Sequence, residues 1–151
     1  MTRSEIIEGL KKYFKTKELV CPHVYAEHGN KSWRFISTAF LHTLLVLRTQ
    51  ILKVPLVCNT ATLTQRGLRC NLCDIVKEKT EDGIVYLSAH HLGIGGDLSS
   101  PDMTAEEMRQ KIEEKQDLLP YPVRIERKVN WLHIDCYDDI DDNNKITYFN
   151  P

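Results

Sequence analysis

The sequence feature that most restricts the fold is residues 88–97, which read Ser-Ala-His-His-Leu-Gly-Ile-Gly-Gly-Asp. His90 and Asp97 stand seven positions apart across a glycine-rich stretch. Because glycine adopts backbone conformations that other residues avoid, the chain can double back there and bring the imidazole and the carboxylate to one point. Both groups are zinc ligands. The segment therefore predicts a metal site; the alternative interpretation is a strand–turn–strand in which the core satisfies His90.

A catalytic zinc usually takes three protein ligands and keeps one position for water, so a further ligand is expected elsewhere in the chain. His133 stands between Trp131 and Asp135 at a two-residue spacing, in a segment with a strand pattern. Alternate residues of a strand share a face. His90, Asp97 and His133 are therefore the candidate ligands. We expect His23, His28 and His42 to be structural or surface residues, and His91 to be a bystander or a substrate-side residue. Water on such a zinc ion has a pKa of about 7 and serves as the nucleophile of a hydrolase.

The chain has 151 residues, 42% of them hydrophobic, which suits one globular domain. Apolar spacing predicts helices over residues 4–14, 33–52 and 68–79. A Thr-x-x-Glu capping box at Thr104 predicts another helix, ending near residue 118. Strand patterns cover residues 56–58, 85–88, 123–129, 131–135 and 146–149. We expect an α+β fold with an antiparallel sheet: N-terminal helices over about 1–53 and a metal-binding core over about 54–151.

Residues 138–144 read Asp-Asp-Ile-Asp-Asp-Asn-Asn and lie between the last two predicted strands. They predict a polar hairpin loop. A calcium loop is the less favoured alternative, because the segment lacks the ligand spacing and the terminal Glu of such loops.

The formal net charge is −1, which gives no electrostatic reason to expect nucleic acid or a membrane surface as a partner. Residues 1–12 alternate charged and apolar side chains and lack the continuous apolar stretch of a secretory signal. The most apolar segment, residues 35–52, contains Arg48 and is expected to be a buried helix. We expect a monomer that is cytoplasmic when synthesised.

Two motifs carry a family resemblance. Ser-x-His-x-x-Gly-x-x-x-Asp begins at Ser88, and Trp-x-His-x-Asp begins at Trp131. Together they resemble the D-Ala-D-Ala carboxypeptidase family of zinc peptidases, which shares its fold with the zinc-binding signalling domain of hedgehog proteins and includes many phage endolysins. The similarity runs from about Cys58 to the C-terminus, and the N-terminal part also resembles peptidases of phages and prophages.

The resemblance implies that Zn²⁺ is held by His90, Asp97 and His133, and that Ser88 supports a ligand or contacts the substrate. It implies a peptidoglycan hydrolase, a D,D- or L,D-type carboxypeptidase or endopeptidase, which acts as a phage-type lysin on the cell wall after release by a holin. An upstream arginine binds the substrate carboxylate in this family, a role that suits the planar guanidinium. We prefer Arg66 for this role to Arg69, which is expected on the following helix.

The chain departs from the family pattern at the general base. The family places Glu or Asp three residues before the last His, whereas this chain has Asn130, and an amide is no base at neutral pH. Asp135 is the first substitute, although it would alternatively only orient His133. Glu126 is the second, if the chain turns near residues 129–130. Weakened or absent activity is the third possibility.

This departure motivates two rival hypotheses: a zinc-stabilised module that binds peptidoglycan or protein without turnover, and a metal-free structural domain. A milder departure is Gly95, which replaces an Ala of the family and is expected to have little steric effect.

The five cysteines are an odd number without a secretory context, so reduced thiols are expected. Cys70 and Cys73 form a Cys-x-x-Cys motif. With Cys58 or Cys136 it would hold a structural zinc, and alone it would be a redox pair. Since the same spacing also arises from packing on a helix, we interpret these residues as plain buried thiols.

Overall fold

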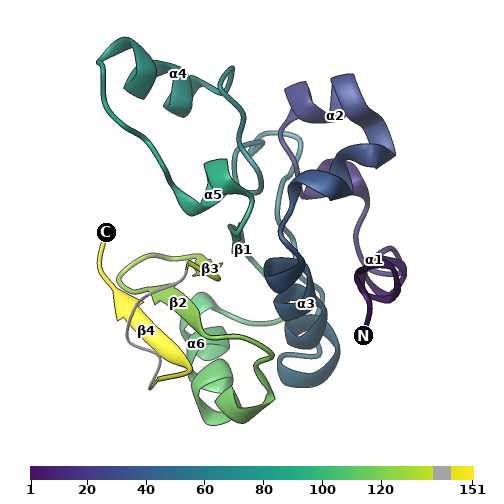
Figure 1. The fold of residues 1–151 in the computed structure, drawn as a ribbon. Coiled ribbons are helices and arrows are strands. Elements are labelled where there is room, and N and C mark those ends of the chain that lie inside the picture. Colours follow the sequence, from purple (N-terminus) through teal and green to yellow (C-terminus); the bar gives the residue numbers. More distant parts are fainter. Residues whose placement is uncertain (138–143) are drawn as a thin grey trace.

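Helices occupy most of the N-terminal half of the chain, and the strands lie in the C-terminal half (Figure 1). The computed structural model describes residues 1–137 and 144–151. The helices are α1 (Arg3–Leu10), α2 (Pro22–His28), α3 (Thr38–Val46), α4 (Asp74–Glu81), α5 (Ala89–Leu92) and α6 (Ala105–Glu114). Short 3₁₀ segments are η1 (Thr16–Glu18), η2 (Gly29–Phe35) and η4 (Gln116–Leu118), and η3 (Leu47–Ile51) is a π-helical turn that continues α3. The strands are β1 (Gly95–Leu98), β2 (Val123–Glu126), β3 (Leu132–Asp135) and β4 (Ile146–Phe149).

The four strands form one mixed sheet in the order β1-β3-β2-β4. Strands β1 and β2 both run antiparallel to β3, whereas β4 runs parallel to β2. The predicted α+β class is confirmed, but the prediction of a wholly antiparallel sheet is wrong. The last two strands form no hairpin, because β4 pairs with β2 and not with β3. Residues 138–143, which include most of the predicted loop and its calcium alternative, lie outside the described residues.

Local capping signals place several helices where the sequence predicts them. Thr104 and Glu107 form the expected capping box, with Thr104 accepting from the Glu107 amide at 3.2 Å, and α6 begins at the next residue. The predicted helix over residues 4–14 is α1, but it ends at Leu10. The helix predicted over residues 33–52 begins only at Thr38, because Ser37 accepts from the Phe40 amide and caps α3 there.

Other predicted elements differ from the structure. The helix predicted over residues 68–79 starts at Asp74, after an extended stretch. Residues 85–88 form no strand in the described part of the chain, and Val85 is 85% exposed. Residues 56–58 contribute a single bridge, between Val57 and Ser99. A segment around Pro22 that lacks a clear helical period is α2, with the proline in its first turn.

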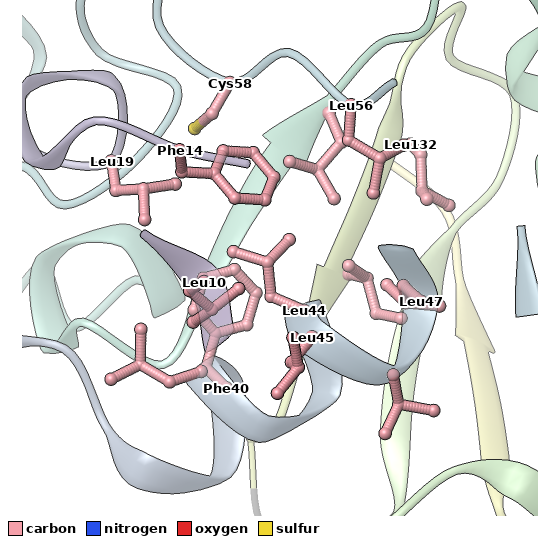
Figure 2. Close-up of a cluster of buried hydrophobic side chains, with 14 of the residues drawn as sticks. Leu10, Phe14, Leu19, Phe40, Leu44, Leu45, Leu47, Leu56, Cys58 and Leu132 are labelled. Atoms are coloured by element: carbon pink, nitrogen blue, oxygen red, sulfur yellow. The ribbon is translucent and has the colours of Figure 1, made fainter. Parts of the chain in front are cut away.

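One hydrophobic cluster runs from the N-terminal helices into the sheet, which makes the chain a small single-domain fold (Figure 2). Leu41 and Leu44 of α3 and Leu47 at the start of η3 are fully buried. Helix α3 packs against α1 and η3 packs against α6, and buried residues of the sheet belong to the same cluster. A second, much smaller cluster has only Cys21, Cys73 and Val76 as its buried members. Within residues 1–137 and 144–151, no helix combines the length and hydrophobicity needed to cross a bilayer.

Candidate metal centre

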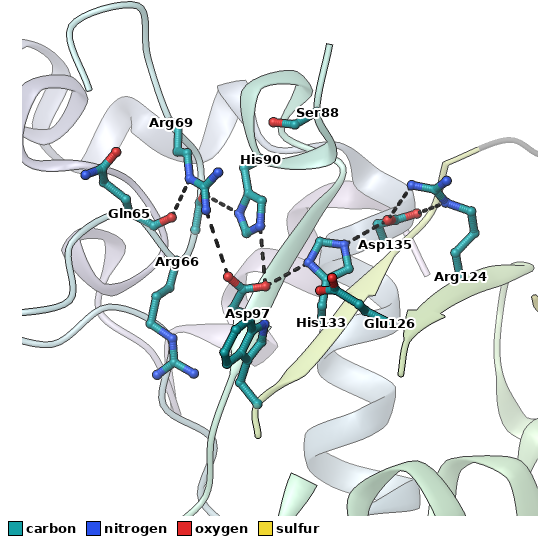
Figure 3. Close-up of polar contacts among 12 residues, drawn as sticks. Gln65, Arg66, Arg69, Ser88, His90, Asp97, Arg124, Glu126, His133 and Asp135 are labelled. Atoms are coloured by element: carbon teal, nitrogen blue, oxygen red, sulfur yellow. Dashed lines mark hydrogen bonds and ion pairs between the residues drawn. The ribbon is translucent and has the colours of Figure 1, made fainter. Parts of the chain in front are cut away.

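His90, Asp97 and His133 converge in the structure, as the sequence predicts (Figure 3). Ser88 caps α5 by accepting from the His91 amide at 3.2 Å, and this short helix carries His90. Gly93 ends α5 with a φ of 68°, a left-handed conformation that favours glycine. The chain then returns as β1, where Asp97 pairs directly with His133 of β3. The ligand atoms of the three residues lie within 4.8 Å of one another.

Each imidazole is held on one side and presents its other nitrogen to the cluster. His90 Nδ1 lies 3.0 Å from the Gly67 carbonyl oxygen, and its Nε2 lies 3.3 Å from Asp97 Oδ1. His133 Nε2 lies 2.9 Å from Asp135 Oδ2, and its Nδ1 lies 2.7 Å from the same Asp97 oxygen. A carbonyl or carboxylate that accepts from one ring nitrogen leaves the other with a free lone pair for a metal.

The donor set fits a tetrahedral metal ion such as zinc. Zinc–nitrogen and zinc–oxygen bonds of about 2.0–2.2 Å place neighbouring ligand atoms about 3.3 Å apart. The His90–Asp97 distance of 3.3 Å already has this value. The His133–Asp97 distance of 2.7 Å is a hydrogen bond and would widen by about 0.6 Å around an ion. Among the described residues this group has three members, the number of protein ligands typical of a catalytic zinc ion.

The three side chains form a strongly coupled electrostatic unit. Burial opposes ionisation of Asp97, but hydrogen bonds from His133 and His90 outweigh it and hold the pKa of Asp97 well below its usual range. Burial likewise lowers the pKa of His133, but hydrogen bonds to Asp135 and Asp97 raise it overall to about 9. Without a metal, His133 is therefore an imidazolium between two carboxylates. A metal ion would replace its proton.

The ligands line a pocket of about 460 Å³. Its wall also contains Arg69, Glu126, Trp131 and Phe149, together with Ser88. The predicted site residue Ser88 thus both caps α5 and borders the pocket. Arg69 lies with its Nη2 4.0 Å from Asp97 Oδ2, so the two oxygens of Asp97 face different partners.

Asp135 is fully buried and its oxygens are occupied. Arg124 donates from Nε to Oδ1 and from Nη2 to Oδ2, both at 2.9 Å. The Tyr137 amide donates to Oδ1 at 3.0 Å, and His133 faces Oδ2. Burial raises the pKa of Asp135, but the bonds from His133 and Arg124 lower it overall. This geometry suits the alternative role, the orientation of His133, better than the role of general base.

Glu126 is the second predicted base candidate, and its side chain lines the pocket with the ligands. It follows Arg124 by two residues on β2, so both side chains leave the strand on the face opposite the buried Ile125. Figure 3 draws its carboxylate beside His133. Asn130, at the position of the family's base, lines a different cavity next to α6.

The two arginine candidates differ in position. The preferred residue, Arg66, donates from Nη2 to Ser99 Oγ at 2.6 Å and points away from the ligands (Figure 3). Arg69 lines the pocket, held by Nε to the Gln65 carbonyl at 2.6 Å and Nη1 to the Tyr86 hydroxyl at 3.0 Å. The expectation that Arg69 lies on a helix is wrong, because α4 begins five residues later.

Gly95 is not a mild departure, contrary to the sequence-based expectation. It lies opposite Asp135 in the sheet. A methyl group on Gly95 would conflict with the Asp135 Cβ atom and would lie 2.9 Å from the Ile134 carbonyl oxygen. The close approach of β1 to β3 therefore requires glycine at this position.

A second group of potential ligands comprises Cys21, His23, Cys70 and Cys73. Cys21 and His23 stand 49 and 47 positions before Cys70 in the sequence. The sequence pattern of the Cys-x-x-Cys pair therefore did not predict them as its neighbours. Cys58 and Cys136, the partners considered from the sequence, are not members of this group. The signal in the sequence is a second short motif, Cys-Pro-His at residues 21–23. Only the fold shows that this motif lies beside the Cys-x-x-Cys motif.

Comparison with known proteins finds no matching family model, no matching curated protein and no matching solved structure.

Proposed function

We propose that this chain is a zinc-dependent peptidase that hydrolyses peptide bonds in bacterial peptidoglycan. The observation that carries the proposal is the three-ligand group of His90, Asp97 and His133 on the wall of an open pocket. Structural zinc sites are closed by four protein ligands, whereas catalytic sites keep a position for water or substrate. The carboxylate of Glu126 and the guanidinium of Arg69 border the same pocket. A carboxylate can accept the proton of the attacking water, and a guanidinium can bind a substrate carboxylate.

A zinc ion, when bound, supplies a Lewis acid that acidifies water and polarises the scissile carbonyl group. Glu126 is the residue we assign to accept the proton of the attacking water and to return it to the leaving amine. Asp135 keeps His133 oriented through its bond to Nε2, and Arg124 holds Asp135 in turn. Arg69 is the residue we assign to the substrate carboxylate, in place of Arg66.

Two features support a short peptide as the substrate. The pocket volume of about 460 Å³ lies in the range of small-molecule sites. The wall offers an arginine for a carboxylate and the aromatic side chains of Trp131 and Phe149. The resemblance of the two motifs to D-Ala-D-Ala carboxypeptidases points to the D-alanine-containing stem peptides of the cell wall, and to a phage-type lysin.

The test is the release of peptide fragments from purified peptidoglycan by zinc-loaded protein. Glu126→Gln should bind zinc at this centre like the wild type and lose at least about 100-fold in rate, the usual contribution of a general base. Glu114→Gln, an exposed carboxylate on α6, is the matched control and should leave the rate unchanged.

Zinc binding at this centre without fragment release from any wall chemotype would refute the peptidase proposal and support the rival binding module. A Glu126→Gln variant with the wild-type rate would refute the assignment of the base. Absence of metal at His90, Asp97 and His133 would remove the basis of the whole proposal.

A further inference from the structure

The second group of potential ligands lies where two helices begin. Cys21 directly precedes α2 and His23 is in its first turn. Cys73 directly precedes α4, and Cys70 lies in the turn before it. Val20 and Leu68 form a parallel bridge, and the Cys21 amide donates to the Leu68 carbonyl at 2.8 Å. This pairing brings the two short motifs together although they are far apart in the sequence.

The spacing of the side chains matches a tetrahedral site. His23 Nδ1 lies 3.6 Å from Cys70 Sγ and 3.8 Å from Cys73 Sγ. All four ligand atoms lie within 4.8 Å of one another. Zinc bonds of about 2.3 Å to sulfur and about 2.0 Å to nitrogen place neighbouring tetrahedral ligands about 3.5–3.8 Å apart.

The local backbone is also arranged for a metal-binding turn. The Leu72 amide lies 3.4 Å from Cys70 Sγ, where it would donate to a thiolate. The Cys73 amide donates to the Cys70 carbonyl at 3.1 Å, which closes the turn between the two sulfurs. Backbone donors of this kind support and orient metal-bound sulfur.

We propose that Cys21, His23, Cys70 and Cys73 bind a structural zinc ion. Three sulfurs and one imidazole in tetrahedral array form a closed set typical of structural zinc. Plain core packing does not explain the group, since His23 is exposed and Cys70 is only partly buried. A disulfide would use two of the three thiols and leave the third beside the imidazole without a role.

The surrounding fold needs such a link. The small cluster under α4 has only three buried members, Cys21, Cys73 and Val76. So small an apolar core gives little stability by itself, and small units of this kind commonly depend on a metal. Arg69 and Ser88, which stand on either side of residues 70–86, both line the pocket of the first group. A structural zinc ion would therefore also support the wall of that pocket. The importance of this support for activity rests on the proposed function, whereas the proposal of the zinc site does not rest on it.

Cobalt titration of the full chain, stripped of metal and kept reduced, tests the site. Co²⁺ bound by thiolates gives intense ligand-to-metal charge-transfer absorption, which a site of His and Asp lacks. We expect two Co²⁺ ions per chain and this absorption in the wild type. The absorption should persist in His133→Ala, which removes a ligand of the first centre only, so the two proposals can fail separately.

Cys70→Ser and His23→Ala are the decisive variants, because neither side chain is part of the tightly buried core. Each should weaken zinc binding at this site at least about 100-fold, since even residues that merely hold a metal ligand are typically worth 10- to 100-fold. Cys136→Ser is the matched control and should bind both ions normally. The proposal is overturned by wild-type protein that lacks the charge-transfer absorption or by an unchanged signal in Cys70→Ser.

Discussion

Asp135 and Glu126 are carboxylates on adjacent strands, yet their surroundings differ. Asp135 is fully buried and accepts from Arg124, His133 and the Tyr137 amide, whereas Glu126 is only partly buried and lines the pocket. In Asp135→Asn an NH2 group replaces one carboxylate oxygen, and this group cannot accept the hydrogen bonds that the oxygen accepts. We expect zinc affinity at the first centre to fall about 10- to 100-fold, because His133 loses the group that orients it.

Competition with a chromophoric chelator measures this change. Glu126→Gln is the comparison variant, and its zinc affinity should equal that of the wild type. Equal affinities in wild type and Asp135→Asn would contradict the orienting role.

The raised pKa of His133 leads to a second prediction, which concerns the stability of the metal-free protein as a function of pH. This pKa is raised from 6.5 to about 9, so the stabilising charge is fully present below pH 6.5 and is lost as the pH rises through about 9. Asp97 has a lowered pKa, so its contribution is lost only as the pH falls below about 3.8. The free energy of unfolding should therefore decline between pH 6.5 and 9, by up to about 3 kcal/mol from His133.

Urea unfolding in the presence of a chelator, at several pH values across this window, checks the decline. His133→Gln is the control because it lacks the titrating imidazole. Burial raises the pKa of the Cys58 thiol to about 12, so the contribution of that thiol to stability is lost only above about pH 9. A slope that is the same in wild type and His133→Gln would contradict the assignment to His133.

At the scale of elements, the contact between β1 and β3 sets the distance between Asp97 and His133. Gly95→Ala should push the two strands apart at Asp135 and destabilise the fold by about 1–3 kcal/mol, the usual cost of overpacking. It should also weaken zinc binding, because His133 depends on Asp135. Gly96→Ala places its methyl group 3.2 Å from the Arg66 carbonyl oxygen, a milder contact, and should cost less.

Thermal unfolding and zinc competition on the two variants give the comparison. The role assigned to Gly95 would be wrong if Gly96→Ala proved equally damaging in both measurements.

The elements that the sequence predicts well are those with signals inside the element itself. The capping box at Thr104 fixes the start of α6, and the apolar period of α1 reveals its buried face. The elements predicted wrongly depend on distant partners. Residues 85–88 have a strand pattern but form no strand in the described part of the chain, and β4 lies parallel to β2 through a pairing that no local pattern encodes.

At the scale of the whole molecule, the convergence of His90, Asp97 and His133 was predictable because these residues lie in two compact motifs, one of which contains a glycine turn. The roles of the neighbouring groups were not. Arg66 and Arg69 are placed by contacts with distant residues, Ser99 and Tyr86. The role of Asp135 likewise depends on Arg124 of the next strand. The second group depends on the bridge between Val20 and Leu68, which joins segments almost fifty residues apart.

The two proposed metal sites lie in different parts of the molecule, so the loss of metal should loosen those parts unequally. The group at Cys70 joins α2 to the start of α4, over an apolar cluster with only three buried members. The helices α3 and α6 belong to the large cluster, which contains no metal ligand. Removal of zinc should therefore expose the backbone of residues 70–86 to solvent while α3 and α6 stay folded.

Amide hydrogen exchange on metal-free and zinc-loaded protein measures this difference segment by segment. Cys70→Ser loaded with zinc should show the fast exchange of residues 70–86 and a protected first centre, because only the second site is lost. His133→Ala should show the reverse: protected residues 70–86 and faster exchange in β1 and β3. Uniform loss of protection in both variants would mean that the molecule unfolds as one cooperative unit, without the separate local stabilisation argued for the two centres.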